Sequence, residues 1–332
     1  MNVSMPEDLR LHQLNDCDGT PYYLVFSTAH SDYDSWIMHL GGPDENGKLI
    51  QSLLTNNSVF IDVGANIGTL SIPVARHSKK VITVEVNPLN NLRLWLGAVA
   101  NKINNIHIVS AAASDSDGIT YFSGSEAWGH VVADPNAGTP CVSLKLDTML
   151  QPFEFDLSQG TPILKIDVEG HESHTLRGAE KTLAKYRPYV LIESIDIEGF
   201  HDTDARHAKK FLEFSDYSLF LVHKNKLVPR KQSDLQENHV ADFLAVPNEL
   251  TQNFHADGFD ITDLSNVEML EIIDNLSTHP VIHHRRHAVG VLIRWSKEKP
   301  ELFHLAENIS VRLIEDSELQ ELTSPLIENL RK

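Results

Sequence analysis

The sequence predicts an α/β fold in which a seven-stranded, mostly parallel sheet is covered by helices. Between residues 59 and 193, short apolar runs alternate with segments of helical periodicity, which is typical of βαβ units. Four such runs end in an acidic residue: Asp62, Glu85, Asp167 and Glu193. Parallel strands share one carboxyl edge, where open α/β sheets bind ligands, so we expect these acids to lie together.

The 332 residues allow one large α/β domain with an appendage. We expect a lead-in over residues 1–50, the main domain over 51–248 and a helical module over 250–332, where glycine is scarce and apolar spacing is helical. Within the lead-in, residues 22–26 predict a strand and residues 36–40 either a strand or a short helix. The lead-in is expected to form a lid or sheet edge over the site, or simply to pack beside it.

The first informative stretch, residues 59–70, predicts a buried strand, a tight turn and a helix. The turn residues are Gly64, Ala65, Asn66 and Gly68. Glycine permits left-handed dihedral angles and close approach of a ligand, and a following helix N-terminus suits a carboxylate. The turn has neither the G-x-G-x-x-G pattern nor the lysine of a P-loop, which argues against a pyrophosphate cradle.

The second apolar run, residues 81–84, ends in Glu85, about twenty residues after the turn, as expected for an acid that binds a ribose diol. A nucleoside without phosphates that carries an amino-acid tail fits both features, and S-adenosylmethionine (SAM) is such a molecule. The alternative is a structural turn with Glu85 as a solvated strand end.

A third strand is predicted at residues 106–109, followed by small residues that would let an adenine ring lie flat. Ser114 or Asp115 could then bond the adenine amine, unless they belong to an ordinary turn. Residues 116–150 predict a β-rich insertion. In it, Trp128 and His130 are candidates for substrate contact, although packing within their own domain is commoner.

The second informative stretch is residues 163–172, where Lys165 lies within an apolar strand. A buried lysine needs a partner, and Asp167, Asp147 or Glu193 could serve. If the protein transfers a group from SAM to a hydroxyl, a general base or a metal is needed for that hydroxyl to lose its proton.

The candidates for this role share positions at or just beyond the ends of the predicted strands. They are Asp167, Glu169, His171 and Glu193. Asp167 could instead be a structural partner of Lys165 and a contact to the SAM amine. Asp167, Glu169 and Glu193 could also bind Mg²⁺, which prefers oxygen ligands.

A histidine cluster lies in the C-terminal module, at His279, His283, His284 and His287. No cysteine or aspartate accompanies it, so we interpret it as a solvated basic helix and expect no metal there. The adjacent Arg285 and Arg286 could bind an acidic partner or pack against the acidic main domain.

The net charge of −18 disfavours binding to nucleic acid or to anionic membranes. Cys17 and Cys141 are the only cysteines and give neither a disulfide framework nor zinc spacing. No run is apolar enough for a signal peptide or a membrane span. We therefore expect a cytoplasmic protein that does not act on nucleic acid.

Taken together, the motifs resemble the FkbM-type methyltransferases. They are DVGANIGTL at 62–70, AAASD at 111–115, LDTML at 146–150, LKIDVEGHE at 164–172 and LRGA at 176–179. The resemblance covers about residues 55–247. It implies a class I, Rossmann-like, SAM-dependent enzyme that O-methylates sugars or other hydroxylated natural products. One departure is conservative: Val86 stands where the family often has proline.

The resemblance also implies roles for individual residues. Asp62, Gly64, Ala65, Asn66 and Gly68 would line the methionine end of SAM. Glu85 would hold the ribose, and Ser114 and Asp115 would lie near the adenine. Asp167 and Glu169 would face the methyl group and the acceptor.

Two other classes of function remain open. One is a SAM-binding scaffold without catalysis that acts through residues 250–332, by a protein partner or by self-association. The other is a nicotinamide-dependent oxidoreductase on the same sheet, which the missing G-x-G-x-x-G pattern disfavours.

Overall fold

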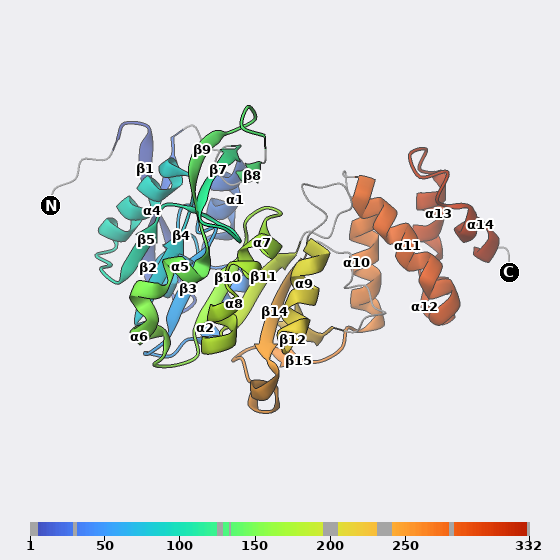
Figure 1. The fold of residues 1–332 in the computed structure, drawn as a ribbon. Coiled ribbons are helices and arrows are strands. Elements are labelled where there is room, and N and C mark those ends of the chain that lie inside the picture. Colours follow the sequence, from blue (N-terminus) through green and yellow to red (C-terminus); the bar gives the residue numbers. More distant parts are fainter. Residues whose placement is uncertain are drawn as a thin grey trace.

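A computed structural model describes residues 6–28, 32–124, 129–132, 134–194, 205–230, 241–278 and 282–330. Its central feature is a nine-stranded sheet (Figure 1). From one edge to the other, the strands are β15 (Asp260–Ile261), β13 (Lys226–Pro229), β12 (Tyr217–His223), β14 (Ala241–Pro247), β11 (Tyr189–Ser194), β10 (Ile163–Ile166), β3 (Val59–Val63), β4 (Lys80–Val84) and β5 (Ile106–Val109).

The sheet is mostly parallel. Strands β3, β4, β5, β10 and β11 are parallel, whereas β14 is antiparallel to both of its neighbours, β11 and β12. The prediction of seven strands was too low, because β13 and β15 extend the sheet beyond β12. The seven strands from β12 to β5 correspond to the sheet that was predicted.

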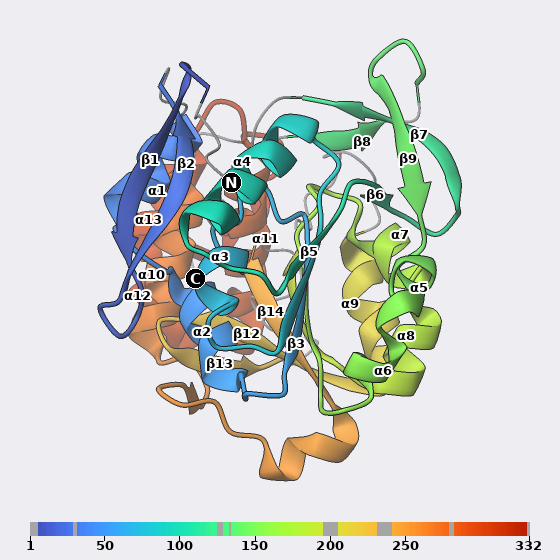
Figure 2. The ribbon, with the colours of Figure 1, turned by 90° about the vertical axis from the view of Figure 1, so that its left-hand side faces the viewer.

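Helices cover both faces of the sheet, as Figure 2 shows. One face carries α2 (Glu45–Leu53), α3 (Ser71–Val74) and α4 (Pro88–Ala100). The other carries α5 (Leu146–Met149), α6 (Glu154–Leu157), α7 (Glu172–Arg177), α8 (Glu180–Tyr186) and α9 (Ala205–Phe214).

Strand alternation divides the core between these two helical layers. On β3, Phe60 packs in the cluster of α2, whereas Val59 and Ile61 pack in the cluster of α7, α8 and α9. All three side chains are buried. The near-continuous apolar run of β3 therefore reflects a parallel strand that is buried on both faces.

Two smaller elements flank the carboxyl edge of the main sheet. Before β3, a hairpin of β1 (Leu9–Asn15) and β2 (Pro21–Ser27) leads into the helix α1 (Asp32–Leu40), so the helical alternative for residues 36–40 is correct. After β5, a second sheet has the order β6 (Ala112–Ala113), β9 (Thr139–Leu144), β7 (Gly118–Ser123) and β8 (His130–Val132).

The C-terminal segment is helical and extends to one side of the main sheet (Figure 1). Its helices are α10 (Asn266–Thr278), α11 (Ile282–Glu298), α12 (Pro300–Leu305), α13 (Glu307–Glu315) and α14 (Ser324–Leu330), packed around an apolar cluster of their own. Within the described part of the chain, no helix has both the length and the hydropathy to cross a bilayer.

Candidate active site

The turn after β3 brings the ends of two strands into contact. Gly64 has φ of +79°, and a Cβ atom there would lie 1.7 Å from the carbonyl oxygen of Asp167, just beyond β10. Only glycine fits such a position, for its dihedral angle and for its size. The helix that follows, α3, has only four residues, so the expected anion site at a helix N-terminus gains little support.

Glu85 fixes the shape of the same turn. Its carboxylate accepts hydrogen bonds from the backbone N–H of Asn66 (2.8 Å) and of Asn87 (2.7 Å). Burial raises the pKa of Glu85 even though both bonds favour its charged form. Because each carboxylate oxygen has two lone pairs, Glu85 can hold the turn and still accept from a diol.

Lys165 joins the two strand ends electrostatically. Its Nζ atom lies 2.9 Å from Oδ2 of Asp167 and 3.9 Å from Oδ1 of Asp62. Oδ2 of Asp62 accepts a hydrogen bond of 2.6 Å from Ser71. Burial opposes the ammonium form of Lys165, but Asp167 and Asp62 outweigh burial and raise its pKa. Of the three partners that the sequence left open for Lys165, Asp167 is therefore the one that pairs with it.

Asp147, the second partner considered for Lys165, has another role. Its carboxylate accepts hydrogen bonds from the backbone N–H of Lys181 (3.0 Å) and of Thr182 (2.8 Å). Both amides belong to the first turn of α8. Asp147 therefore caps the N-terminus of α8 and is not the partner of Lys165.

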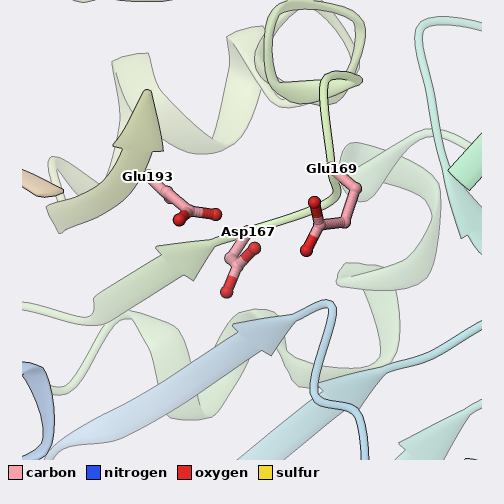
Figure 3. A group of neighbouring side chains, drawn as sticks. All are labelled: Asp167, Glu169 and Glu193. Atoms are coloured by element: carbon pink, nitrogen blue, oxygen red, sulfur yellow. The ribbon is translucent and has the colours of Figure 1, made fainter. Parts of the chain in front are cut away.

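Three carboxyl groups converge at the carboxyl ends of β10 and β11 (Figure 3). Asp167, Glu169 and Glu193 each place an oxygen atom within 4.8 Å of the other two. Asp167 and Glu193 share a hydrogen bond, which requires a proton on one of them. The charge of Asp167, together with burial, raises the pKa of Glu193, whereas the pKa of Asp167 is lowered, so Glu193 is the partner that holds the proton.

The other two carboxyls differ in ionisation. Burial works against the charge of Asp167, but Lys165 and the hydrogen bond with Glu193 lower its pKa. For Glu169, burial and the charges of Asp167 and Glu172 raise the pKa to about 8. The site therefore pairs one ionised carboxylate with one that titrates near neutral pH.

Glu172 holds the loop that follows β10 and carries Glu169. Its side chain is fully buried, and Oε1 accepts hydrogen bonds from the backbone N–H of Val168 (3.2 Å) and of Gly170 (3.0 Å). Glu169 itself has φ of +53°, which is uncommon for a residue with a side chain. The buried carboxyl thus holds Glu169 in a strained conformation.

A pocket opens over these groups. Of the predicted site residues, those that line it are Gly64, Asn66, Glu85, Asp167, Glu169 and His171. Asp62, Ala65, Gly68 and Glu193 lie outside the lining. The small residues Ala111, Ala112 and Ala113 also line it, as expected for a flat ring.

The two residues predicted near adenine are likewise outside the lining. Ser114 lies at 3.1 Å from Nε2 of His171, a lining residue. Asp115 faces other partners, with Arg177 at 3.5 Å and His174 at 4.0 Å. The structure thus brings Ser114, but not Asp115, next to a lining side chain.

The remaining walls were only partly predicted. The lead-in lines the pocket, as the lid interpretation expected, through Tyr33, Trp36 and Ile37 of α1 and through Asp44 and Asn46. None of these residues was singled out from the sequence. The three on α1 share a face only if the segment is helical, and Asp44 and Asn46 belong to the start of α2.

The second sheet contributes the opposite wall, with Phe122, His130 and Val131. His130 was one of two candidates for substrate contact, and the other, Trp128, lies outside the described residues. In the C-terminal module, His279 and the side chains of His283, His284 and His287 are also outside them. Arg285 is 2.7 Å from Asp316 and contacts Glu318, so it packs within the helical module.

The pocket fits a nucleoside that carries an amino-acid tail. Gly64 leaves the backbone open to a ligand, and Glu85 offers carboxylate lone pairs to a diol. Oδ1 of Asn66 is buried without a hydrogen-bond partner, although Asn66 lines the pocket. A buried polar atom of this kind calls for a ligand to satisfy it.

The sheet order, with one antiparallel strand next to the parallel set and the site at the carboxyl edge, is that of the Rossmann-like fold of class I methyltransferases. Residues 62–219 match the model of the methyltransferase FkbM domain. The resemblance to the FkbM-type methyltransferases is therefore confirmed over these residues, which make up just under half of the chain.

Individual relatives are more distant. A probable ribosomal RNA small subunit methyltransferase A from Methanosphaera stadtmanae is 34% identical over 64 residues. That match covers 19% of this chain and 24% of the relative, so the chain spans about a quarter of the relative's length.

Solved structures match over larger parts of the chain. Methyltransferase FkbM from Methylobacillus flagellatus KT is 16% identical, with a TM-score of 0.39, over 59% of this chain and 47% of that one. TYW2 of M. jannaschii, in complex with AdoMet, is 15% identical, with a TM-score of 0.34, over 74% of this chain and 86% of that one.

Proposed function

We propose that this methyltransferase transfers the methyl group of SAM to a hydroxyl of a sugar, a glycan or another hydroxylated natural product. The observation that carries the proposal is the carboxyl cluster of Asp167, Glu169 and Glu193 beside the turn of Gly64 and the carboxylate of Glu85. A cofactor cradle and a group that can accept a proton thus share one pocket.

In the proposed complex, Gly64 and Asn66 hold the methionine end of SAM and Glu85 holds the ribose. Asp62, Ala65 and Gly68 support that turn from behind. The adenine lies against Ala111–Ala113, with Ser114 rather than Asp115 near its amine, because Asp115 already faces Arg177. SAM supplies an electrophilic methyl group, and the chain positions the acceptor in line with it.

We assign the general base to Glu169. A base works best when its pKa is close to the working pH, and Glu169 lines the pocket with a pKa of about 8. Asp167 is occupied by Lys165 and Glu193, and His171 by Ser114. In this scheme Asp167 and Glu193 share one proton and orient Lys165. Glu169 removes the proton from the hydroxyl of the acceptor.

A metal is the alternative to a base. The three carboxyl groups offer the oxygen ligands that Mg²⁺ prefers, within 4.8 Å of one another. If Mg²⁺ is used, activity should disappear in EDTA and return when Mg²⁺ is added. Full activity in EDTA would eliminate the metal and leave Glu169 as the base.

Transfer of a radiolabelled methyl group from SAM to a glycan or lipid-glycan extract tests the proposal, with label expected in a base-stable ether. Calorimetry with SAM, S-adenosylhomocysteine (SAH) and NAD accompanies it. SAM binding without transfer to any acceptor pool would favour a non-catalytic scaffold. NAD binding without SAM binding would favour an oxidoreductase.

A further inference from the structure

We infer that Trp36 is the platform on which the acceptor ring stacks, and that the acceptor wall accepts neutral or amine-bearing sugars and excludes anionic ones. This inference rests on the proposed function, because it concerns the acceptor of the same pocket.

Helix α1 turns one face toward the pocket. Tyr33, Trp36, Ile37 and Leu40 all line it, and their spacing of three and four residues is that of a single helical face. The rings of Tyr33 and Trp36 lie 5.9 Å apart. The hydroxyl of Tyr33 is 3.4 Å from Oγ1 of Thr69, so this face adjoins the cofactor turn.

The helix is fixed from the opposite side. Asp34 is fully buried, bonds to the buried Arg93 of α4 and accepts a hydrogen bond of 2.8 Å from the N–H of Ser27. Trp36 nevertheless remains 49% exposed at the pocket. An aromatic side chain that is held in place and left uncovered in a pocket wall offers a flat apolar surface to a ligand ring.

Exposure alone does not make Trp36 special. Trp95 on α4 is 41% exposed, but it does not line the pocket. What distinguishes Trp36 is that carboxylates share its pocket. An apolar face beside hydrogen-bond acceptors matches a sugar, which has C–H groups on its ring faces and hydroxyls on its rim.

The charges of the wall select among sugars. The lining carries four acidic residues, Asp44, Glu85, Asp167 and Glu169, and one lysine. That lysine, Lys165, already pairs with Asp167 at 2.9 Å. Among the described lining residues, no other lysine or arginine is present to bind a carboxylate or phosphate of an acceptor. An anionic acceptor would therefore meet repulsion, whereas an amine would be attracted.

A set of probes that differ in one substituent tests this inference. The methyl glycosides of glucose, glucosamine and glucuronic acid are titrated into protein saturated with SAH and followed by saturation-transfer NMR and tryptophan fluorescence. We expect the neutral and amino probes to bind and the glucuronide to bind at least tenfold more weakly.

Matched variants separate the two parts of the inference. Trp36→Leu should weaken binding of the neutral probe at least tenfold and Trp36→Phe only slightly, with the affinity for SAH unchanged in both. Trp95→Leu is the control and should change nothing. Asp44→Asn keeps the cap on the N–H of Gly47, since asparagine also caps helices, and should improve glucuronide binding several-fold.

The inference is overturned if the glucuronide binds as tightly as the glucoside, if Trp36→Leu binds like the wild type, or if SAH-loaded protein binds none of the probes. The proposed function fails separately, by the absence of SAH binding or of methyl transfer. SAH binding with label transfer to an anionic acceptor would therefore reject this inference and leave the methyltransferase assignment intact.

Discussion

Glu169 and Asp167 are two residues apart in the chain, yet their surroundings shift the two pKa values in opposite directions. A base must be ionised to accept a proton. With a pKa of about 8 for Glu169, we expect kcat/KM to rise between pH 7 and pH 9. Glu169→Gln should remove this rise and lower the rate by about 10²- to 10⁴-fold.

The pH profile of single-turnover methyl transfer measures this effect, with Glu154→Gln on the exposed surface as the control. If the Glu169→Gln enzyme kept the wild-type rate and pH profile, the general base would have to be another group.

Gly64 gives a prediction about packing. In Gly64→Ala, the new methyl group would overlap the carbonyl of Asp167, at a φ that alanine disfavours. We expect the free energy of unfolding to fall by at least about 2 kcal/mol, together with loss of SAM affinity. Urea denaturation and calorimetry measure the two effects.

Gly160→Ala is the matched control for this change. A Cβ atom at Gly160 would meet nothing within 4 Å, so stability should hardly change. Equal effects of the two substitutions would contradict the contact between the strand ends.

Glu172 gives a prediction about pH and stability. Burial raises its pKa in the folded protein to about 7, from 4.5 in the unfolded chain. The unfolded chain therefore loses this proton first, and stability should fall as pH rises from about 5 to 7. Glu172→Gln keeps an oxygen for the N–H groups of Val168 and Gly170, so it should make this fall smaller.

Urea denaturation at pH 5, 6, 7 and 8 checks the prediction. The site as a whole should retain part of the slope, because burial also raises the pKa of Asp242 to about 7. An identical slope in the variant would show that Glu172 titrates normally in the folded protein.

At the residue scale, the roles of residues in local motifs could be predicted because they depend on residues close by in the sequence. The turn of Gly64 and the pairing of Lys165 with Asp167 both follow from spacing along one strand or turn. The roles of Asp147, Asp115 and Glu172 were not readable. The role of each carboxyl group depends on which distant segment of the chain packs against it. The order of acidic residues in the sequence does not reveal that segment.

At the scale of elements, α1 depends on one buried ion pair. Asp34 and Arg93 are both almost completely buried. Asp34→Ala leaves the guanidinium of Arg93 without this partner, so we expect a loss of about 3–5 kcal/mol of stability. Acceptor binding should weaken further, since α1 carries the pocket-lining face.

Thermal or urea unfolding measures the loss, and Lys185→Ala is the comparison. Lys185 pairs with Glu154 on the surface, where both side chains are 56% exposed, so its removal should hardly change stability. A double variant, Asp34→Leu with Arg93→Met, should regain part of the stability. Equal losses of stability in Asp34→Ala and Lys185→Ala would mean that the buried pair contributes no more than a surface pair.

Elements with strong periodicity were predictable, including β3, β4, α4 and β10. The strands β1, β13 and β15 were missed. In β15, only two residues pair with β13, which is too short for a pattern to emerge. Such strands form because an existing sheet edge offers them hydrogen bonds, so their cause lies outside their own sequence.

At the scale of the whole molecule, the helices α10–α14 have their own apolar cluster. They meet the main sheet through few contacts, among them Lys226 with Glu268 at 2.7 Å and the shared packing of Leu264. No described residue from 266 onward lines the pocket. Truncation after Ser265 should therefore leave the affinity for SAH within about threefold of that of the full chain.

Calorimetry of the truncated and full chains checks this expectation, with circular dichroism to confirm that the truncated protein is folded. A folded truncated protein that no longer binds SAH would show that the helices support the site at a distance. The sequence predicted these helices but not where they lie, because side-chain contacts such as Lys226–Glu268 decide their placement.

The contact between Gly64 and Asp167 has a consequence for recombination between related proteins. The turn that receives the cofactor and the loop that carries the proposed base touch through backbone atoms, more than a hundred positions apart in the sequence. In a chimera whose first half comes from one relative and whose second half comes from another, the turn at Gly64 must still fit against the backbone of Asp167. The turn of Gly64 and the loop of the proposed base are therefore expected to be inherited together, whereas this contact does not constrain the walls formed by α1 and by β7–β8.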